Sequence, residues 1–243
     1  MLLGSVGGGG SLIAVPALVY LGGQSVRGAQ AGALLVVIAA SAIGSFSYLA
    51  RGEVRWRAGS AFGLAAAASS LAGSLLSRHL DPNVLLLAFA PVMVAGAVAM
   101  VGERARAESS FQPWRLGVSV ASAIRVTLLG FAVGWLTGLF GVGGGFVIVP
   151  ALVLGLGFAM PEAVGTSLLV IIISSLVALA ERLQGDEIDW SVIGPFAAAA
   201  VLGVLFGSAL GKRASSEALT RWFAALVILT ALYTGGKALA ALL

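Results

Sequence analysis

The sequence has no cysteine, a single histidine and few charged residues. Of its 243 residues, 10% are charged and 59% are hydrophobic, whereas a soluble domain carries about 25% charged residues. The lack of cysteine excludes disulfides, thiolate metal sites and cysteine nucleophiles. A soluble fold this apolar would have too few polar side chains to cover its surface. The composition therefore indicates that lipid is the solvent of this chain.

The scarcity of basic runs, buried bases and metal ligands argues against several functional classes. Basic residues occur singly in short connections, without the runs that bind a phosphate backbone, so the net charge of +4 does not indicate nucleic acid. An intramembrane serine protease would need a buried base, and His79 lies in a polar connection. No cluster of His, Asp or Glu has the spacing of metal ligands. We therefore expect no enzyme, no cofactor, no metal and no nucleic-acid partner.

The apolar residues form blocks of the length that a bilayer requires, which is about 20 residues for a helix. The connections between the blocks are too short to hold a soluble domain. We therefore expect an all-α integral membrane protein with about nine transmembrane segments. The predicted segments are 2–21, 28–50, 58–77, 84–102, 117–140, 142–158, 162–180, 191–211 and 218–241.

An internal repeat relates the two halves of the chain. Gly9 and Gly10 precede Pro16 just as Gly143 and Gly144 precede Pro150, and we call the spacing from Pro16 to Pro150 the repeat interval. Proline, tryptophan, glutamate and glycine would not share one ungapped register by chance, so the sequence predicts two copies of one unit. Further pairs at the repeat interval are Gly23 and Gly157, Ala29 and Ala163, Ser41 and Ser175, Glu53 and Glu187, and Trp56 and Trp190.

The charges of equivalent connections indicate that the copies are inverted. One period holds five predicted segments, and an odd number makes the second copy enter the membrane from the other face. The connection 51–57 has three Arg, whereas its counterpart 181–189 has one Arg and four carboxylates. Because Lys and Arg accumulate in cytoplasmic connections, we place 51–57, 103–115 and 212–221 in the cytoplasm. The predicted units are a first repeat at 1–102 with four segments, a cytoplasmic linker at 103–116 and a second repeat at 117–243 with five segments.

Glycine runs mark the predicted substrate-binding site. Helical glycine costs about 1 kcal/mol relative to alanine, so each run favours a broken helix whose freed backbone N–H groups can bind an anion. The alternative is close helix packing through small residues. The pattern of two runs with matched prolines favours the broken helices. The predicted binding residues here are Gly8, Gly9, Gly10, Ser11, Gly143, Gly144 and Gly145, with Pro16 and Pro150 as structural motif.

Polar side chains in the neighbouring segments extend this predicted site. Gly165, Thr166 and Ser167 lie near the start of one segment, and Gln30 lies at the matching level of the other copy. Hydroxyl and amide groups can donate hydrogen bonds to an oxyanion, although membrane Ser and Thr often bond within their own helix. Arg125 lies inside an apolar block and is a candidate for an anion path; the alternative is that its side chain extends to the interface.

These motifs together resemble the TauE/SafE sulfite exporter family, also called the TSUP transporters. The resemblance rests on the duplicated glycine runs with their prolines, on Gly165-Thr166-Ser167 and on the turns at 53–56 and 187–190. It covers nearly the whole chain and implies transport of small sulfur-containing anions. The first copy departs from the pattern, because Gln30-Ala31-Gly32-Ala33 stands where the second copy has Val164-Gly165-Thr166-Ser167.

We therefore expect a secondary transporter or facilitator of a small anion, sulfite or an organosulfonate, in a cytoplasmic (inner) membrane of bacterial type. Its partners are the anionic substrate and the lipid bilayer, and a homo-oligomer is compatible with the sequence. Two alternatives stay open. An anion channel would use the same helix breaks with a continuous pore, and a membrane scaffold subunit would use the glycines for packing alone.

Overall fold

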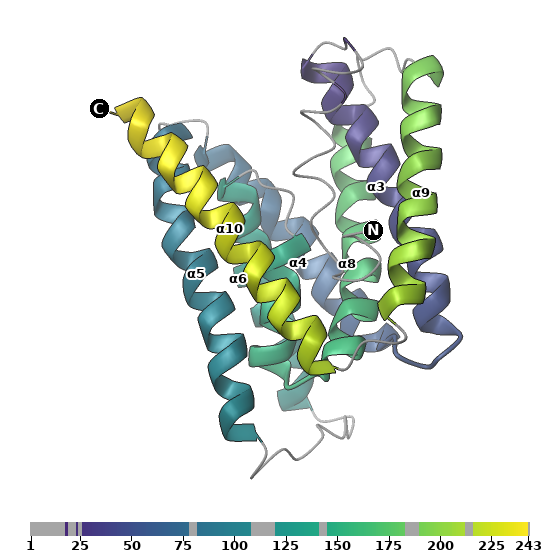
Figure 1. Ribbon diagram of the computed structural model, residues 1–243, viewed down its shortest axis with the longest axis vertical. Coiled ribbons are helices and arrows are strands. Elements are labelled where there is room, and N and C mark those ends of the chain that lie inside the picture. Colours follow the sequence, from purple (N-terminus) through teal and green to yellow (C-terminus); the bar gives the residue numbers. More distant parts are fainter. Residues whose placement is uncertain are drawn as a thin grey trace.

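The computed structural model describes Leu18, Gly23 and residues 26–77, 82–107, 120–140, 145–182, 190–211 and 216–242. Within these residues the chain folds into helices without a strand, which confirms the predicted all-α class (Figure 1). The elements are α3 (Val26–Leu49), α4 (Trp56–Ser77), α5 (Pro82–Ala107), α6 (Val120–Phe140), α7 (Gly145–Pro150), the π-helix η1 (Ala151–Gly155), α8 (Met160–Arg182), α9 (Trp190–Gly211) and α10 (Ser216–Leu242).

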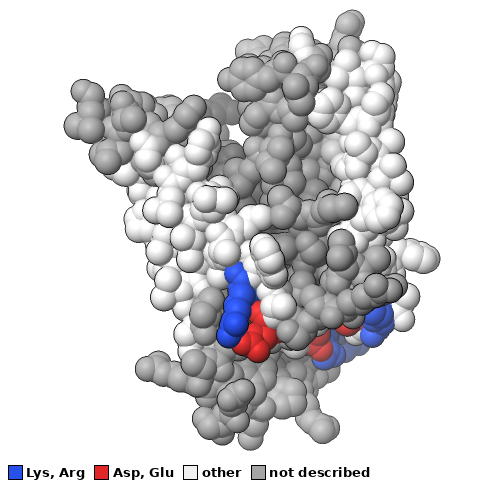
Figure 2. Space-filling view, in the orientation of Figure 1, with Lys and Arg blue, Asp and Glu red and all other residues white. Residues whose placement is uncertain are grey.

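Five of these helices contain stretches long and apolar enough to cross a bilayer, among the residues that the structure describes. Shorter apolar stretches lie in α5 and α10. Figure 2 shows the described Lys, Arg, Asp and Glu side chains on this face in the lower half of the view, and the described residues above them, drawn white, carry no charge. This separation of charge from apolar surface is that of a multi-pass membrane protein. The five stretches are Ala31–Leu49, Trp56–Ser77, Ala121–Leu139, Met160–Ala180 and Trp190–Gly207.

The helix boundaries follow the repeat interval. Helices α3 and α8 begin at Val26 and Met160, and α4 and α9 begin at Trp56 and Trp190. Packing follows the same relation, because α4 packs on α8 while their counterparts α9 and α3 pack on each other. Gly23 and Gly157 also share a left-handed backbone, with φ of 63° and 66°. The sequence repeat is therefore matched by equivalent helices with equivalent contacts.

Helices α4 and α6 pack backbone against backbone. Gly130, Gly134 and Gly138 recur every four residues on α6, on the face that touches α4. A Cβ atom added at Gly134 would lie 2.1 Å from the carbonyl oxygen of Ala66, and one at Gly138 would lie 2.1 Å from that of Ser70. Small residues that allow such an approach are typical of helix pairs in membranes. The glycines of α6 therefore serve packing.

The predicted segment 142–158 differs from the structure. Its described part holds α7 with six residues and η1 with five, and together they are far shorter than the roughly 20 residues of a span. Gly157 then turns the chain with its φ of 66°, and α8 begins at Met160. The helix changes from α to π after Pro150. Within the described residues, this segment is therefore a short helix with a π-helical end, and the prediction of a full span here is not confirmed.

Candidate functional site

The described residues include only part of the predicted glycine site. Gly145 is the first residue of α7, and Pro150 is its last and is buried. The other residues predicted for this part of the site lie outside the described residues; they are Gly8, Gly9, Gly10, Ser11, Pro16, Gly143 and Gly144.

The turn from α7 into η1 has an unusual backbone. A π-helix runs from Ala151 to Gly155, and the Leu156 N–H is shared by the carbonyl oxygens of Leu152 and Val153. The Phe158 N–H donates to Leu152 O at 3.1 Å, which closes the turn. Short π-helical stretches occur frequently at functional sites. The proline motif of the second copy is therefore followed by a π-helical stretch and a turn, whereas the break predicted at the glycine run lies outside the described residues except for Gly145.

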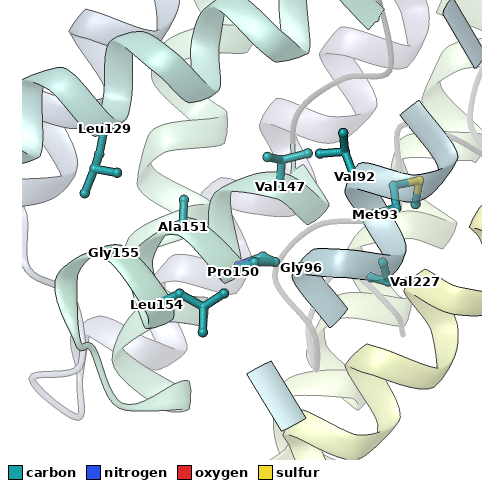
Figure 3. A pocket seen from close by; sticks show the side chains of 10 residues that line it. All are labelled: Val92, Met93, Gly96, Leu129, Val147, Pro150, Ala151, Leu154, Gly155 and Val227. Carbon is teal, nitrogen blue, oxygen red and sulfur yellow. The ribbon is translucent and has the colours of Figure 1, made fainter. Parts of the chain in front are cut away.

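A pocket of about 360 Å³ lies beside the end of α7 and the π-helix η1. Pro150, Ala151, Leu154 and Gly155 line it from one side, and Figure 3 shows side chains of α5, α6 and α10 around it. All of its lining residues are apolar, so none of their side chains can donate a hydrogen bond to an anion. The remaining lining residues are Val92, Met93, Gly96, Leu129, Val147 and Val227.

Thr166 connects the start of α8 to the start of α4. Its side chain is fully buried, and its Oγ1 accepts a hydrogen bond of 3.1 Å from the backbone N–H of Arg55. This N–H directly precedes α4, where backbone N–H groups lack partners within the helix. Thr166 therefore satisfies a donor at the end of another helix, and its oxygen is occupied in this structure.

Gly165 and Ser167 also have protein neighbours. A Cβ atom at Gly165 would lie 2.9 Å from Tyr48 Cβ and 3.0 Å from the carbonyl oxygen of Glu53, so only glycine lets this connection approach α8. The Ser167 hydroxyl donates to Val164 O at 2.8 Å, within its own helix. Of the three residues predicted to bind an anion here, Gly165 and Thr166 contact the connection 50–55, and the Ser167 hydroxyl donates within α8.

Ion pairs surround this contact. Arg55 Nη2 contacts Glu162 Oε1 on α8, and Arg51 Nη1 lies 3.2 Å from Glu53 Oε2. The Arg51 guanidinium also lies 4.3 Å from the centre of the Tyr48 ring and donates from Nε to Ser47 O. Two charged pairs therefore lie where the α3–α4 connection meets α8.

Glu53 has an altered protonation equilibrium. Burial raises the pKa of its carboxyl group; the positive charge of Arg51 opposes this rise, and the negative charge of Glu162 adds to it. Glu53 Oε2 has no hydrogen-bond partner among the described residues, so the contact with Arg51 is an ion pair without a hydrogen bond. The carboxylate of Glu53, in the connection after α3, is thus incompletely solvated.

The remaining predicted residues lie apart from this contact. Gln30 lies in the first turns of α3, at the end of the molecule opposite to the connection 50–55 (Figure 1). Arg125 is exposed on α6. Ser41 on α3, which the repeat pairs with Ser175, is fully buried, and its Oγ has no hydrogen-bond partner among the described residues.

Sequence analysis missed the pairing of Arg55 with Glu162. The two residues are 107 positions apart, and each alone has an ordinary interpretation: a basic residue in a connection, and an acidic residue in the first turn of a helix. No signal in the sequence pairs them, because the repeat relates α4 to α9 and α3 to α8 and does not show that α4 packs on α8.

The sequence profile of the family described as sulfite exporter TauE/SafE matches residues 1–234. The chain belongs to this family. A "Probable membrane transporter protein" of Xylella fastidiosa is 30% identical over 234 residues, which are 95% of this chain and 88% of the relative. The "Probable membrane transporter protein YunE" of Bacillus subtilis is 26% identical over 237 residues, with 89% and 84% covered. No solved structure matches the chain.

Membership of the TauE/SafE family agrees with the helices. Relatives named as membrane transporters extend to Methanocaldococcus jannaschii, where one is 26% identical over 233 residues and 89% of this chain. Together with the five apolar stretches of spanning length, the family identifies a multi-pass membrane protein of a transporter class. These relatives are named as membrane transporters and not as enzymes.

Proposed function

We propose that this TauE/SafE protein moves a small anion, sulfite or an organosulfonate, across the cytoplasmic membrane as a secondary transporter or facilitator. The family match over residues 1–234 carries the proposal. The matched helix starts and reciprocal packing support two repeated units, which many transporters use to bind substrate at the repeat interface.

The directions of the helices support an inverted relation between these units. By the colours of Figure 1, α3 runs from the top of the view to the bottom, and α4 returns, so that α5 again runs downward. Its counterpart α10 starts at the bottom and rises to the C terminus. Counterparts that run in opposite directions fit a two-fold axis in the membrane plane, and rocking of one unit against the other would then alternate access.

Flux into proteoliposomes tests the proposed transport. We expect saturable uptake of at least one anion in a panel of sulfite, thiosulfate, sulfoacetate, taurine, sulfate and phosphate. Flux that does not saturate with concentration would favour a channel, and no flux for any of these anions would contradict the proposal.

Leucine substitutions test whether the glycine runs bind the substrate. Gly10→Leu and Gly144→Leu should each abolish uptake while the protein stays folded, because a side chain there would block the broken backbone. Gly102→Leu is the matched control, since a Cβ atom at Gly102 on α5 meets no atom within 4 Å. Undiminished flux in the two run variants would remove the glycine runs from the mechanism.

A further inference from the structure

The pocket beside α7 and η1 lies near the middle of the helices that form it. Leu129, on its α6 wall, is near the middle of the apolar stretch Ala121–Leu139, which is long enough to cross a bilayer. Met93 and Val227, which also line it, are near the middle of the 26-residue helix α5 and of the 27-residue helix α10. Three helices thus contribute mid-helix residues to the pocket (Figure 3), which places it near the midplane of the membrane.

The pocket also lies where the two repeated units meet. Met93 and Val227 are separated by the repeat interval, and both line the pocket. Their helices are counterparts as well, because α5 begins at Pro82 and α10 begins at Ser216, again one repeat interval apart, and the two helices pack on each other. Equivalent residues of two units share one pocket where the units are in contact. Transporters built from repeated units bind their substrates at this interface, near the midplane.

The lining determines which chemical class the pocket can hold. All ten lining residues are apolar or glycine, so their side chains offer no hydrogen-bond donor. An oxyanion placed here would lose its hydration without replacement, which is costly, whereas a hydrocarbon group gains free energy from the same burial. Met93 and Val227 are buried while Val92 is 41% exposed, so the pocket extends inward from an open rim.

We propose that this pocket binds the hydrocarbon group of an organosulfonate, so that the substrates are sulfonates with an apolar chain and not inorganic sulfite. The inference rests on the proposed transport of a small anion. The sulfonate head lies outside the pocket, because no lining side chain can donate a hydrogen bond to it. The chain packs against Pro150 and Ala151, where α7 passes into η1. Through Met93 and Val227, one ligand contacts both repeated units.

A series of alkanesulfonates measures what the pocket contributes to binding. Dissociation constants for sulfite and for methane-, propane- and hexanesulfonate are obtained by titration calorimetry on the full chain in nanodiscs. Titrations of empty nanodiscs are subtracted to remove partitioning into lipid. Each CH₂ group buried in the pocket should lower the dissociation constant about fourfold, so hexanesulfonate should bind most tightly and sulfite most weakly.

Substitutions that change the volume of the pocket should shift this dependence in opposite directions. A Cβ atom at Gly96 would lie 3.8 Å from Pro150 Cβ, an ordinary contact, so Gly96→Leu fits at the backbone and its side chain fills the pocket. In this variant hexanesulfonate should bind no tighter than propanesulfonate. Leu154→Ala enlarges the pocket and should extend the gain to longer chains. Gly102→Leu is the matched control on the same helix, since a Cβ atom there meets no atom within 4 Å, and it should reproduce the series of the original protein.

One dissociation constant for the whole series, or no binding of any member, would overturn the inference. A uniform constant is also the result expected if an acyl chain of the bilayer occupies the pocket. A chain-length dependence that neither Gly96→Leu nor Leu154→Ala alters would overturn it as well. These outcomes are distinct from failure of the proposed transport. Saturable sulfite uptake with a uniform constant would support transport and contradict the inference, whereas tighter binding of longer sulfonates without uptake would do the reverse.

Discussion

At the scale of single residues, the charged side chains in the connection after α3 make the free energy of unfolding depend on pH. Glu53 is held near Arg51 and Glu162, and its oxygen Oε2 is buried without a hydrogen bond. A carboxyl group whose pKa is higher in the folded than in the unfolded chain binds more protons when folded. Its contribution to the free energy of unfolding therefore falls as pH rises between those two pKa values.

Glu53→Gln should remove this loss of stability. Because glutamine does not ionise, the variant should lose less of its free energy of unfolding as pH rises above about 4.5, the usual range of glutamate. Thermal unfolding in detergent at a series of pH values measures the slope. Arg51→Gln is the complementary variant, and it should steepen the slope because the opposing charge is gone. Equal slopes in all three proteins would contradict the assignment to Glu53.

At the scale of helices, glycine has two separate uses in this chain. On α6 its spacing of four residues lets the backbone of α4 approach closely, and the contacts of α4 with α8 and of α9 with α3 each need one glycine against a larger side chain. In α5, Gly102 meets nothing within 4 Å. The effect of substituting a glycine depends on the atoms around it and not on how many glycines its helix contains.

Gly134→Ala and Gly102→Ala should change stability in opposite directions. The methyl group at 134 would lie 2.1 Å from Ala66 O, so the helices must separate, at a cost at the upper end of about 1–3 kcal/mol. At 102, within α5, the methyl group meets open space, and alanine should be neutral or stabilise the helix by up to about 1 kcal/mol. Unfolding in denaturing detergent measures both. Equal losses would show that the α4–α6 contact does not depend on glycine.

The helices were largely predictable from the sequence, and their contacts were not. The predicted segments 28–50 and 191–211 became α3 and α9 with boundaries within a few residues, because apolar blocks of spanning length leave the backbone no other way to satisfy its hydrogen bonds. Within the segment predicted at 142–158, hydropathy does not detect the change from α7 to the π-helix η1 or the turn at Gly157. The Arg55–Glu162 pair joins residues 107 positions apart, and no local pattern reveals such a contact.

At the scale of the whole molecule, the inverted relation between the repeats is open to a direct test. Ala50→Cys and Gln184→Cys occupy equivalent positions, separated by the repeat interval. Inversion places them on opposite faces of the membrane, so a membrane-impermeant thiol reagent added to sealed inside-out vesicles should label position 50 and spare position 184. Permeabilised vesicles, in which both must react, provide the control. Labelling of both from one face would exclude the inverted arrangement.

The close contact of α4 with α6 has a mechanical consequence. Where the backbones of two helices touch, neither helix can slide or rotate past the other without collision, so α4 and α6 must travel together as one rigid body. Helix α8 packs on α4 through side chains such as Thr166 and Leu169, which can change rotamer and accommodate displacement. Displacement of α4 relative to α8 is therefore easier than displacement of α4 relative to α6, and the α4–α6 pair moves as one unit.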